Sequence, residues 1–210
     1  MTDLETLRAQ AEAPVPATAA DLPGVAADYA AAFAADPMFN WFLKPGPQRP
    51  RHMLAFFRLI LDTTAAPGRR LERPKDGGAA ALWLPSEEMT APGFVAEVRA
   101  ALLFLAASGL ERLPRVTQVR KAMDAHHPND RAHDYLYFLG VRPDLQGSGL
   151  GGRLLKAHTA RLDAAGRPAF LETPNPRTVP LYRAHGFEVI QEYQPAPGSP
   201  MMWPMWREPR

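Results

Sequence analysis

The sequence predicts an α/β or α+β fold, in which helices cover the faces of a sheet. Towards the C-terminus, apolar runs of strand length at residues 135–141, 169–173 and 187–193 alternate with two helical patterns. The succession strand, helix, strand, helix, strand is typical of a layered fold. A content of 46% hydrophobic and 22% charged residues is ordinary for a globular chain of 210 residues.

The N-terminal part is predicted to be helical after a short tail. Residues 1–16 are rich in Ala, Glu and Pro and are expected to form a loose tail, with one domain over residues 17–210. Asp21 is a suitable N-cap for a helix over residues 22–35. That helix is expected to stop before Pro37, because the residue preceding a proline disfavours helical angles.

The middle of the chain combines helices with one pair of strands. An aromatic loop containing Phe39, Trp41 and Phe42 is expected after the first helix. The Lys-Asp-Gly-Gly run at residues 75–78 is a strong turn signal between two strands. The elements expected here are a helix at 50–63, strands at 70–73 and 78–84, and helices at 94–107 and 114–123.

Glycine and proline also indicate the boundaries of the remaining elements. A helix is expected over residues 149–165, with Gly166 as its C-terminal stop. A second, shorter helix is expected over residues 177–185. Residues 201–206 are strand-like, and Pro204 indicates an edge strand because proline has no N–H to donate to a ladder.

Composition excludes several classes of site. The chain has no cysteine, so disulfides, Cys-based metal sites and a thiol acyl-enzyme are excluded. The formal net charge is +2 without a Lys/Arg block, which does not indicate nucleic-acid binding. The first residues lack a signal-peptide pattern, and the longest uncharged apolar stretch, at 100–110, is too short to span a membrane. We therefore expect a soluble, cytoplasmic protein.

A glycine-rich turn between a strand and a helix is the most informative segment. It contains the residues Gln146, Gly147, Ser148, Gly149, Leu150, Gly151 and Gly152. Glycines there allow consecutive backbone N–H groups and the helix N-terminus to point at phosphate oxygens. The alternative is a tight turn in which the glycines serve sterics alone.

Two common phosphate motifs fit this turn poorly. The P-loop pattern fails because Arg153 and Leu154 stand where Lys and Ser or Thr are required. The dinucleotide pattern GxGxxG is formally matched by Gly147, Gly149 and Gly152. However, five residues separate the strand from the first glycine, and too little chain follows for a full dinucleotide-binding domain.

The third pattern, (Gln/Arg)-x-x-Gly-x-(Gly/Ala), is matched by Gln146, Gly149 and Gly151. With the preceding apolar strand and Val141-Arg142-Pro143, it resembles the acyl-CoA motif of the GNAT superfamily of N-acetyltransferases. The resemblance continues through a strand and a Tyr-bearing helix, at residues 170–187. Ala32-Phe33, Ala80-Ala81-Leu82-Trp83 and Leu171-Glu172-Thr173 are similar to segments of puromycin N-acetyltransferase-like members.

The resemblance implies a central mixed, mostly antiparallel sheet with splayed middle strands, and a coenzyme-binding core at residues 135–187. It implies that acetyl-CoA lies in the gap between the strands ending at Val141 and Thr173. Gly140 is the expected site of a bulge that starts the splay. The N–H of Leu139 is expected to polarise the thioester carbonyl, and the backbone of Val141 to bind the pantetheine arm.

The resemblance also implies roles for side chains. Tyr182 corresponds to the family's general acid, although packing between helix and sheet is an alternative role. Asn175 corresponds to an amide that contacts pantetheine, and Thr178 stands where the family often has a second Asn. With no cysteine, direct transfer in a ternary complex is expected.

The base that deprotonates the acceptor amine is expected to be Glu172, at the end of a core strand. His133, Asp134, Tyr137 and a bound water remain alternatives. Phe39, Trp41 and Tyr137 are the expected lining of the acceptor site. His126, His127 and His133 lack metal-ligand spacing, so no metal is expected.

The sequence thus predicts an N-acetyltransferase that moves an acetyl group from acetyl-CoA to a small-molecule amine. A catalytically idle acyl-CoA sensor and a nicotinamide-dependent oxidoreductase are the competing hypotheses. Neither nucleic acid nor a membrane is an expected partner. The oligomeric state is open, with a homodimer as one option.

Overall fold

The structure, a computed structural model, describes residues 2–63, 70–89 and 93–210. Its centre is a seven-stranded sheet with the strand order β1-β2-β3-β4-β5-β7-β6. The strands are β1 (Val15–Pro16), β2 (Arg70–Arg73), β3 (Ala79–Pro85), β4 (Asp134–Val141), β5 (Ala169–Thr173), β6 (Glu188–Val189) and β7 (Trp203–Arg207). Among the described strands, only β4 and β5 run parallel, and every other neighbouring pair is antiparallel. This mixed, mostly antiparallel sheet confirms the expected fold class.

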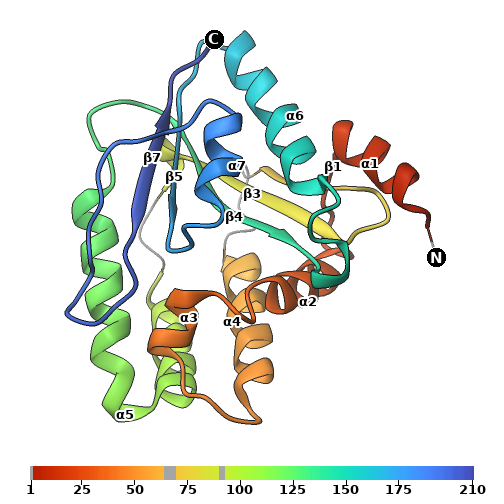
Figure 1. Cartoon of the computed structure of the whole chain (residues 1–210). Coiled ribbons are helices and arrows are strands. Elements are labelled where there is room, and N and C mark those ends of the chain that lie inside the picture. Colours follow the sequence, from red (N-terminus) through yellow and green to blue (C-terminus); the bar gives the residue numbers. More distant parts are fainter. Residues whose placement is uncertain (1, 64–69, 90–92) are drawn as a thin grey trace.

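Helices cover both faces of the sheet (Figure 1). They are α1 (Leu4–Glu12), α2 (Leu22–Ala32), α3 (Pro37–Phe42), α4 (Arg49–Thr63), α5 (Phe94–His126), α6 (Leu150–Ala164) and α7 (Val179–Ala184). Two 3₁₀ turns, Ser86–Glu88 and Pro143–Leu145, follow β3 and β4. In Figure 1, α2, α3 and α4 gather below the sheet, and α6 and α1 lie above it.

Each face of the sheet has its own hydrophobic core. Ala79, Ala81 and Trp83 of β3 pack with α1, α6 and α7 on one side, here called the α6 face. Ala80 and Leu82 pack with α2, α3, α4 and α5 on the other side, here called the α4 face. The two sets alternate because successive side chains of a strand point to opposite faces.

The predicted loose tail is wrong. Residues Leu4–Glu12 form a helix, capped by the Asp3 carboxylate, which accepts the N–H of Thr6 at 2.9 Å. Leu7 and Ala11 are buried against α6, and Val15–Pro16 pair with β2. The segment is ordered because its short apolar stripe completes the core of the α6 face.

The expected aromatic loop is also wrong, since most of it forms α3. Asp36 Oδ1 accepts the N–H groups of Met38 and Phe39, at 2.9 and 3.0 Å, and so caps the helix start. The two helices expected after residue 93 are joined as α5, with a break at Gly109, where φ is 68°. That left-handed angle suits glycine and turns the chain within the helix.

β7 is an interior strand between β5 and β6, so its prediction as an edge strand is wrong. Pro204 is tolerated because its backbone faces β6, where its carbonyl accepts the N–H of Ile190 at 3.0 Å. β6 has ended by that residue, so the missing proline N–H breaks no bond of a continuous ladder.

Other expected elements are confirmed. β2 and β5 have the expected bounds, and α6 ends before Gly166, which adopts a φ of 60°. Within the described residues, no helix combines the length and apolar character needed to span a bilayer.

Candidate functional site

The two parallel strands part in the middle of the sheet. Asp134, Tyr135 and Leu136 of β4 pair with Ala169, Phe170 and Leu171 of β5. Beyond Leu136, β4 continues to Val141 paired with β3 alone, while β5 ends paired with β7. A gap therefore opens between the C-terminal ends of β4 and β5, as the expected splay requires.

A β-bulge at Tyr137 marks the start of this gap. Leu82 pairs with Phe138 and the next residue of β3, Trp83, pairs with Leu136, so Tyr137 is the extra residue. Tyr137 and Phe138 consequently both pack on the α4 face. The expected bulge at Gly140 is wrong, because Gly140 pairs regularly with Ala80.

Gly140 has a packing role instead. A Cβ atom there would lie 2.6 Å from the Tyr29 ring of α2, so only glycine allows that approach. Tyr29 is fully buried, and its hydroxyl lies 3.5 Å from the Phe138 carbonyl. α2 thereby packs directly on β4 at the gap.

The backbone of β4 presents polar groups to the gap. The Arg142 N–H donates to the Gly78 carbonyl at 2.8 Å, which fixes the alternation of bonded pairs between β3 and β4. In that alternation, the amides of Leu139 and Val141 point away from β3 and towards the gap. The Val141 carbonyl accepts a hydrogen bond from Gln146 Nε2 at 3.1 Å, so Gln146 ties the turn to the strand.

The glycine-rich turn leads directly into α6. Gly147 and Gly149 have φ angles of 76° and 87°, in the left-handed region that favours glycine. Among the described residues, no acceptor takes the N–H groups of Gly147, Gly149, Leu150, Gly151 or Gly152. Free N–H groups at a helix start bind anions, so the turn fits the pyrophosphate of a coenzyme.

α1 supports this turn from outside. Arg8 Nε donates to the Ser148 carbonyl at 3.0 Å. Arg153 Nε donates to Glu12 Oε1 at 2.9 Å, and Arg153 Nη1 to the Gly149 carbonyl at 3.3 Å. The segment expected to be a tail therefore holds the turn on two sides.

One cavity of about 2070 Å³ joins the turn, the gap and the α4 face. It brings together most of the residues that the sequence placed in the site. These are Phe39, Tyr137, Leu139, Gly140, Val141, Gln146, Gly147, Gly149, Leu150, Gly151, Gly152, Glu172, Asn175 and Tyr182. Ser148 and Trp41 are outside this lining. The carbonyl of Trp41 accepts Arg115 Nη1 at 2.8 Å, and its ring lies under that guanidinium.

Glu172 is a buried carboxyl group in the wall of this cavity. Burial raises the pKa of Glu172 to about 7, although the hydrogen bond from Tyr193 and the nearby Tyr135 hydroxyl oppose the rise. Its Oε1 atom accepts the Tyr193 hydroxyl at 2.7 Å. Its Oε2 atom is buried without a hydrogen-bond partner in the described structure. A carboxyl group that is half ionised at neutral pH, with one oxygen free, is suited to accept a proton.

Tyr193 was absent from the residues that the sequence suggested. It follows β6 and reaches Glu172 because it pairs with Met202, just before β7. The strand predicted at 187–193 contained Tyr193, but nothing local in the sequence indicates a contact with a residue on β5.

Tyr182 of α7 lies at the edge of the cavity with its ring buried on the α6 face. Burial raises the pKa of Tyr182 above its usual value, and the nearby Asp36 charge raises it further. The hydroxyl therefore stays protonated at neutral pH. No hydrogen bond to another described residue occupies it.

Asn175 and Thr178 form the connection between β5 and α7. Asn175 Oδ1 accepts the Arg177 N–H at 3.1 Å. Thr178 Oγ1 lies 2.8 Å from both the Asn175 carbonyl and Thr173 Oγ1. Thr178 thus braces the loop, whereas Asn175 lines the cavity.

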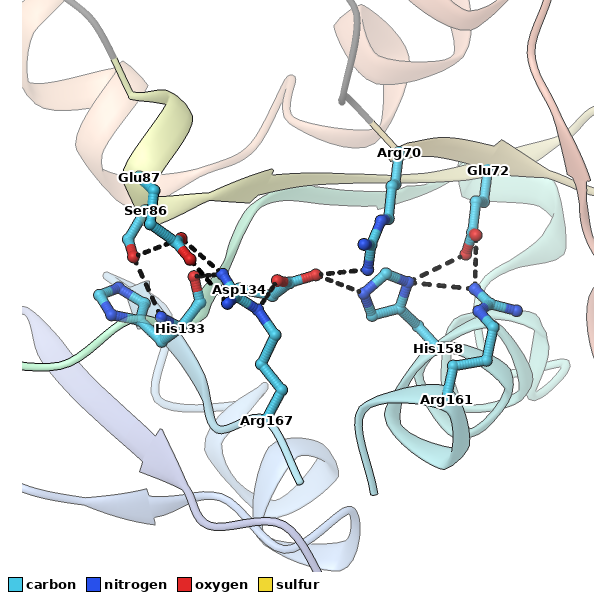
Figure 2. A network of polar contacts seen from close by, with 9 residues as sticks. All are labelled: Arg70, Glu72, Ser86, Glu87, His133, Asp134, His158, Arg161 and Arg167. Carbon is cyan, nitrogen blue, oxygen red and sulfur yellow. Dashed lines mark hydrogen bonds and ion pairs between the residues drawn. The ribbon is translucent and has the colours of Figure 1, made fainter. Parts of the chain in front are cut away.

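Asp134 and His133, two alternatives for the base, already form hydrogen bonds with other side chains (Figure 2). Asp134 is buried and accepts hydrogen bonds from Arg167, Arg70 and His158. With Glu72, Glu87 and Arg161 these residues form what we call the interior ion-pair network. His133 is buried beside His127, with the two Nε2 atoms 3.2 Å apart.

The histidines do not gather ligands for a metal. Among the residues that the structure describes, no three His, Asp or Glu side chains are placed to hold an ion. Burial is the main cause that lowers the pKa of His127 to about 4, which keeps that ring neutral.

Comparison with known proteins agrees with this geometry. Residues 115–189 match the family described as the acetyltransferase (GNAT) domain. A solved structure from Corynebacterium glutamicum, described as histone acetyltransferase HPA2 and related acetyltransferase, is 25% identical with a TM-score of 0.68. The similarity covers 94% of this chain and 96% of that one.

Two further solved structures show the same fold at lower identity. Arylalkylamine N-acetyltransferase 2 from Aedes aegypti is 14% identical, with a TM-score of 0.59 over 94% of this chain and 98% of that one. An agmatine N-acetyltransferase is 16% identical, with a TM-score of 0.58 over 93% of this chain and 98% of that one.

Proposed function

We propose that this chain, whose residues 115–189 match the acetyltransferase (GNAT) domain family, transfers an acetyl group from acetyl-CoA to an amine of a small molecule. The acceptor and the donor meet in the gap between β4 and β5. The observation that carries the proposal is the Glu172 carboxyl group, which belongs to a residue lining the cavity beside that gap and has one buried oxygen, Oε2, without a hydrogen-bond partner among the described residues.

Acetyl-CoA, when bound, supplies the acetyl group as a thioester. The residues that would hold it are the glycine-rich turn at its pyrophosphate and the β4 backbone at Leu139 and Val141 along its pantetheine arm. The fit rests on the unpaired N–H groups of the turn and on the space that glycine leaves there. An added Cβ atom at Gly147 would meet nothing within 4 Å, which leaves room for a ligand to approach the backbone.

Proton transfer is assigned to two side chains. An amine with a pKa near 10 is mostly an ammonium ion at neutral pH, so it must lose a proton before its nitrogen can attack. Glu172 accepts that proton at Oε2. The Leu139 N–H stabilises negative charge on the carbonyl oxygen, and Tyr182 donates its proton or a hydrogen bond to the leaving sulfur.

Transfer is direct, in a ternary complex. The sequence contains no cysteine that could carry the acetyl group between the two substrates. Steady-state rates should therefore give intersecting lines when both substrates are varied.

The α4 face forms the acceptor side of the cavity. Phe56, Phe104, Tyr137 and Phe138 line it and are only partly buried, so they offer apolar contact area. A small amine with an apolar or aromatic body fits this wall. Agmatine, arylalkylamines and amino-nucleosides of the puromycin type are the amines to test first.

The test is a measurement of CoA release from acetyl-CoA against a panel of such amines. Turnover with any amine supports the enzyme, whereas binding without turnover across the panel favours an idle sensor. Thermal unfolding with acetyl-CoA, CoA or NAD separates both from an oxidoreductase. A ligand present at 100 times its Kd adds about 2.7 kcal/mol to the free energy of unfolding. Stabilisation by NAD alone would overturn the proposal.

A further inference from the structure

Tyr193 lies in an excursion of the chain between β6 and β7. Its N–H donates to the Met202 carbonyl at 3.1 Å, and the Met202 N–H donates back at 2.8 Å. The tip is closed by Ser199, whose N–H donates to the Ala196 carbonyl at 3.0 Å and whose Oγ accepts the Ala196 N–H at 3.2 Å. Backbone bonds hold this segment, and none of them involves the Tyr193 hydroxyl.

The ring of Tyr193 is fixed by stacking. It is buried, and it lies parallel to the His126 ring of α5 with centroids 3.8 Å apart and an interplanar angle of 6°. His126 is itself held, because its Nδ1 lies 2.7 Å from the Ala122 carbonyl and must donate to it. A side chain fixed by packing presents its polar end in one direction.

That polar end meets the Glu172 carboxylate. The hydroxyl donates to Oε1 at 2.7 Å, while Oε2 has no partner among the described residues. Burial and the neighbouring Glu172 charge raise the pKa of Tyr193, so its hydroxyl keeps the proton that it donates. Hydrogen bonds to an ionised acceptor are about twice as strong as neutral ones.

We propose that Tyr193 is a positioning residue for Glu172, which holds Oε1 so that Oε2 alone receives the proton from the acceptor amine. The inference rests on the proposed acetyl transfer. In the step concerned, an N–H bond of the ammonium breaks and an O–H bond forms at Oε2. The electron pair stays on the nitrogen, which becomes the nucleophile. Tyr193 touches neither substrate and keeps its own proton throughout.

The test is Tyr193→Phe, which removes the hydroxyl and retains the ring that stacks on His126. Without the hydrogen bond, the ionised form of Glu172 is less favoured. The pH midpoint of kcat/KM should therefore rise by about one unit. At pH 7 the rate should fall about fivefold from this cause, and it should recover above the new midpoint. The KM for acetyl-CoA should not change.

Tyr29→Phe is the matched control. It makes the same change in the same core, but the Tyr29 hydroxyl faces the Phe138 carbonyl and not Glu172. Its pH midpoint should equal that of the parent. A folded Tyr193→Phe protein with the parental midpoint would overturn the inference.

A second measurement separates this inference from the function on which it rests. The Glu172 carboxyl is titrated by NMR in protein labelled with ¹³C at glutamate side chains, with Glu172→Gln assigning the signal. An upward shift of that titration in Tyr193→Phe supports the positioning role even if no amine is acetylated. Acetyl transfer with an unshifted titration would retain the function and reject the role of Tyr193.

Discussion

His158 Nε2 and Asp134 Oδ2 lie 3.1 Å apart in the protein interior, where α6 crosses the first residue of β4. The other ring nitrogen, Nδ1, lies 3.2 Å from Glu72 Oε2 on β2. The His158 ring is also stacked on Trp83 of β3, with centroids 4.1 Å apart. One side chain therefore links three strands to α6, at the end of the sheet away from the glycine-rich turn.

His158→Phe should destabilise the fold. Phenylalanine keeps the stack on Trp83 but removes both hydrogen bonds, which leaves the buried Asp134 carboxylate with fewer partners. Breaking a buried pair in this way costs about 3–5 kcal/mol of unfolding free energy, measured by urea denaturation. Glu208→Gln, in an exposed pair with Arg131, is the control and should cost less than about 1 kcal/mol. Equal effects of the two changes would contradict a special role for the interior ion-pair network.

The same network predicts acid sensitivity. Burial alone would raise the pKa of Asp134, but hydrogen bonds from His158 and Arg167 and the Arg70 charge outweigh it and lower the pKa. The pKa of Glu72 is lowered in the same way, against its own burial, by His158 and Arg161. A lowered folded-state pKa contributes stability above the unfolded value, about 4, that is lost as the pH falls further. The parent should lose stability below about pH 4 more steeply than His158→Phe.

Glu172→Gln should remove the proposed base. In the parent, kcat/KM should rise with pH and level off above about 7, because only the carboxylate accepts a proton and its pKa is about 7. In the variant, the rate should be lower by about 10²–10⁴-fold and should lose this limb. The measurement needs an acceptor amine whose own pKa is near 10, so that the two titrations are separated.

Asp124→Asn should change the pH profile of kcat/KM by a smaller amount than Glu172→Gln. Asp124 lines the cavity, and its charge is a minor cause that raises the pKa of Glu172. Its removal should shift the pH midpoint of kcat/KM slightly downward.

Full activity in Glu172→Gln would mean that another group or water, and not Glu172, is the base.

Gly149→Val should abolish acetyl-CoA binding, because it adds a β-branched side chain at a left-handed N-cap beside the unpaired N–H groups. Gly166→Val is a matched control with a φ of 60° at the other end of α6. Both carry the strain of a left-handed residue, roughly 1–2 kcal/mol. Calorimetric titration of acetyl-CoA should show lost affinity only for Gly149→Val. Parental affinity in a folded Gly149→Val protein would reject the pyrophosphate site.

Two changes at Tyr182 distinguish catalysis from packing. If its hydroxyl assists the leaving sulfur, Tyr182→Phe should lower kcat by about 10²–10⁴-fold and leave the Kd for acetyl-CoA unchanged. If the ring matters only for packing, Tyr182→Phe should be nearly silent. In both cases Tyr182→Ala should cost about 3–5 kcal/mol of stability, because the ring is buried against Phe187. Rates must be measured where chemistry limits turnover.

The elements around the turn were predictable because their signals are local. β5 is a short apolar run, and α6 lies between the glycines of the turn and Gly166. The hydrophobic pattern and the flanking glycines therefore indicate the same elements. Gly149 could be proposed because it stands where the turn meets a helix, and Glu172 because it is near the end of a strand. These signals need no knowledge of distant residues.

The missed features depend on partners far away in the sequence. Leu7 and Ala11 form too small an apolar stripe to indicate a helix until α6 covers them. Pro204 shows that one edge of its strand lacks a backbone N–H donor, but not whether a short strand lies along that edge. The contact between Glu172 and Tyr193 follows from the pairing of Tyr193 with Met202, which no local pattern specifies.

The extra residue Tyr137 also changes which side chains of β4, odd- or even-numbered, lie on each face of the sheet. Up to Tyr135 the odd-numbered side chains belong to the α4 face, whereas after the extra residue the even-numbered Phe138 does. A mutant library that varied every second position would alter both faces at once. To vary acceptor preference and coenzyme contacts separately, a library must change odd-numbered positions before residue 137 and even-numbered positions after it, or the reverse. Deleting that residue would restore one parity throughout, because Leu136 and Phe138 would keep their partners Trp83 and Leu82 and each half of the strand would stay on its present face.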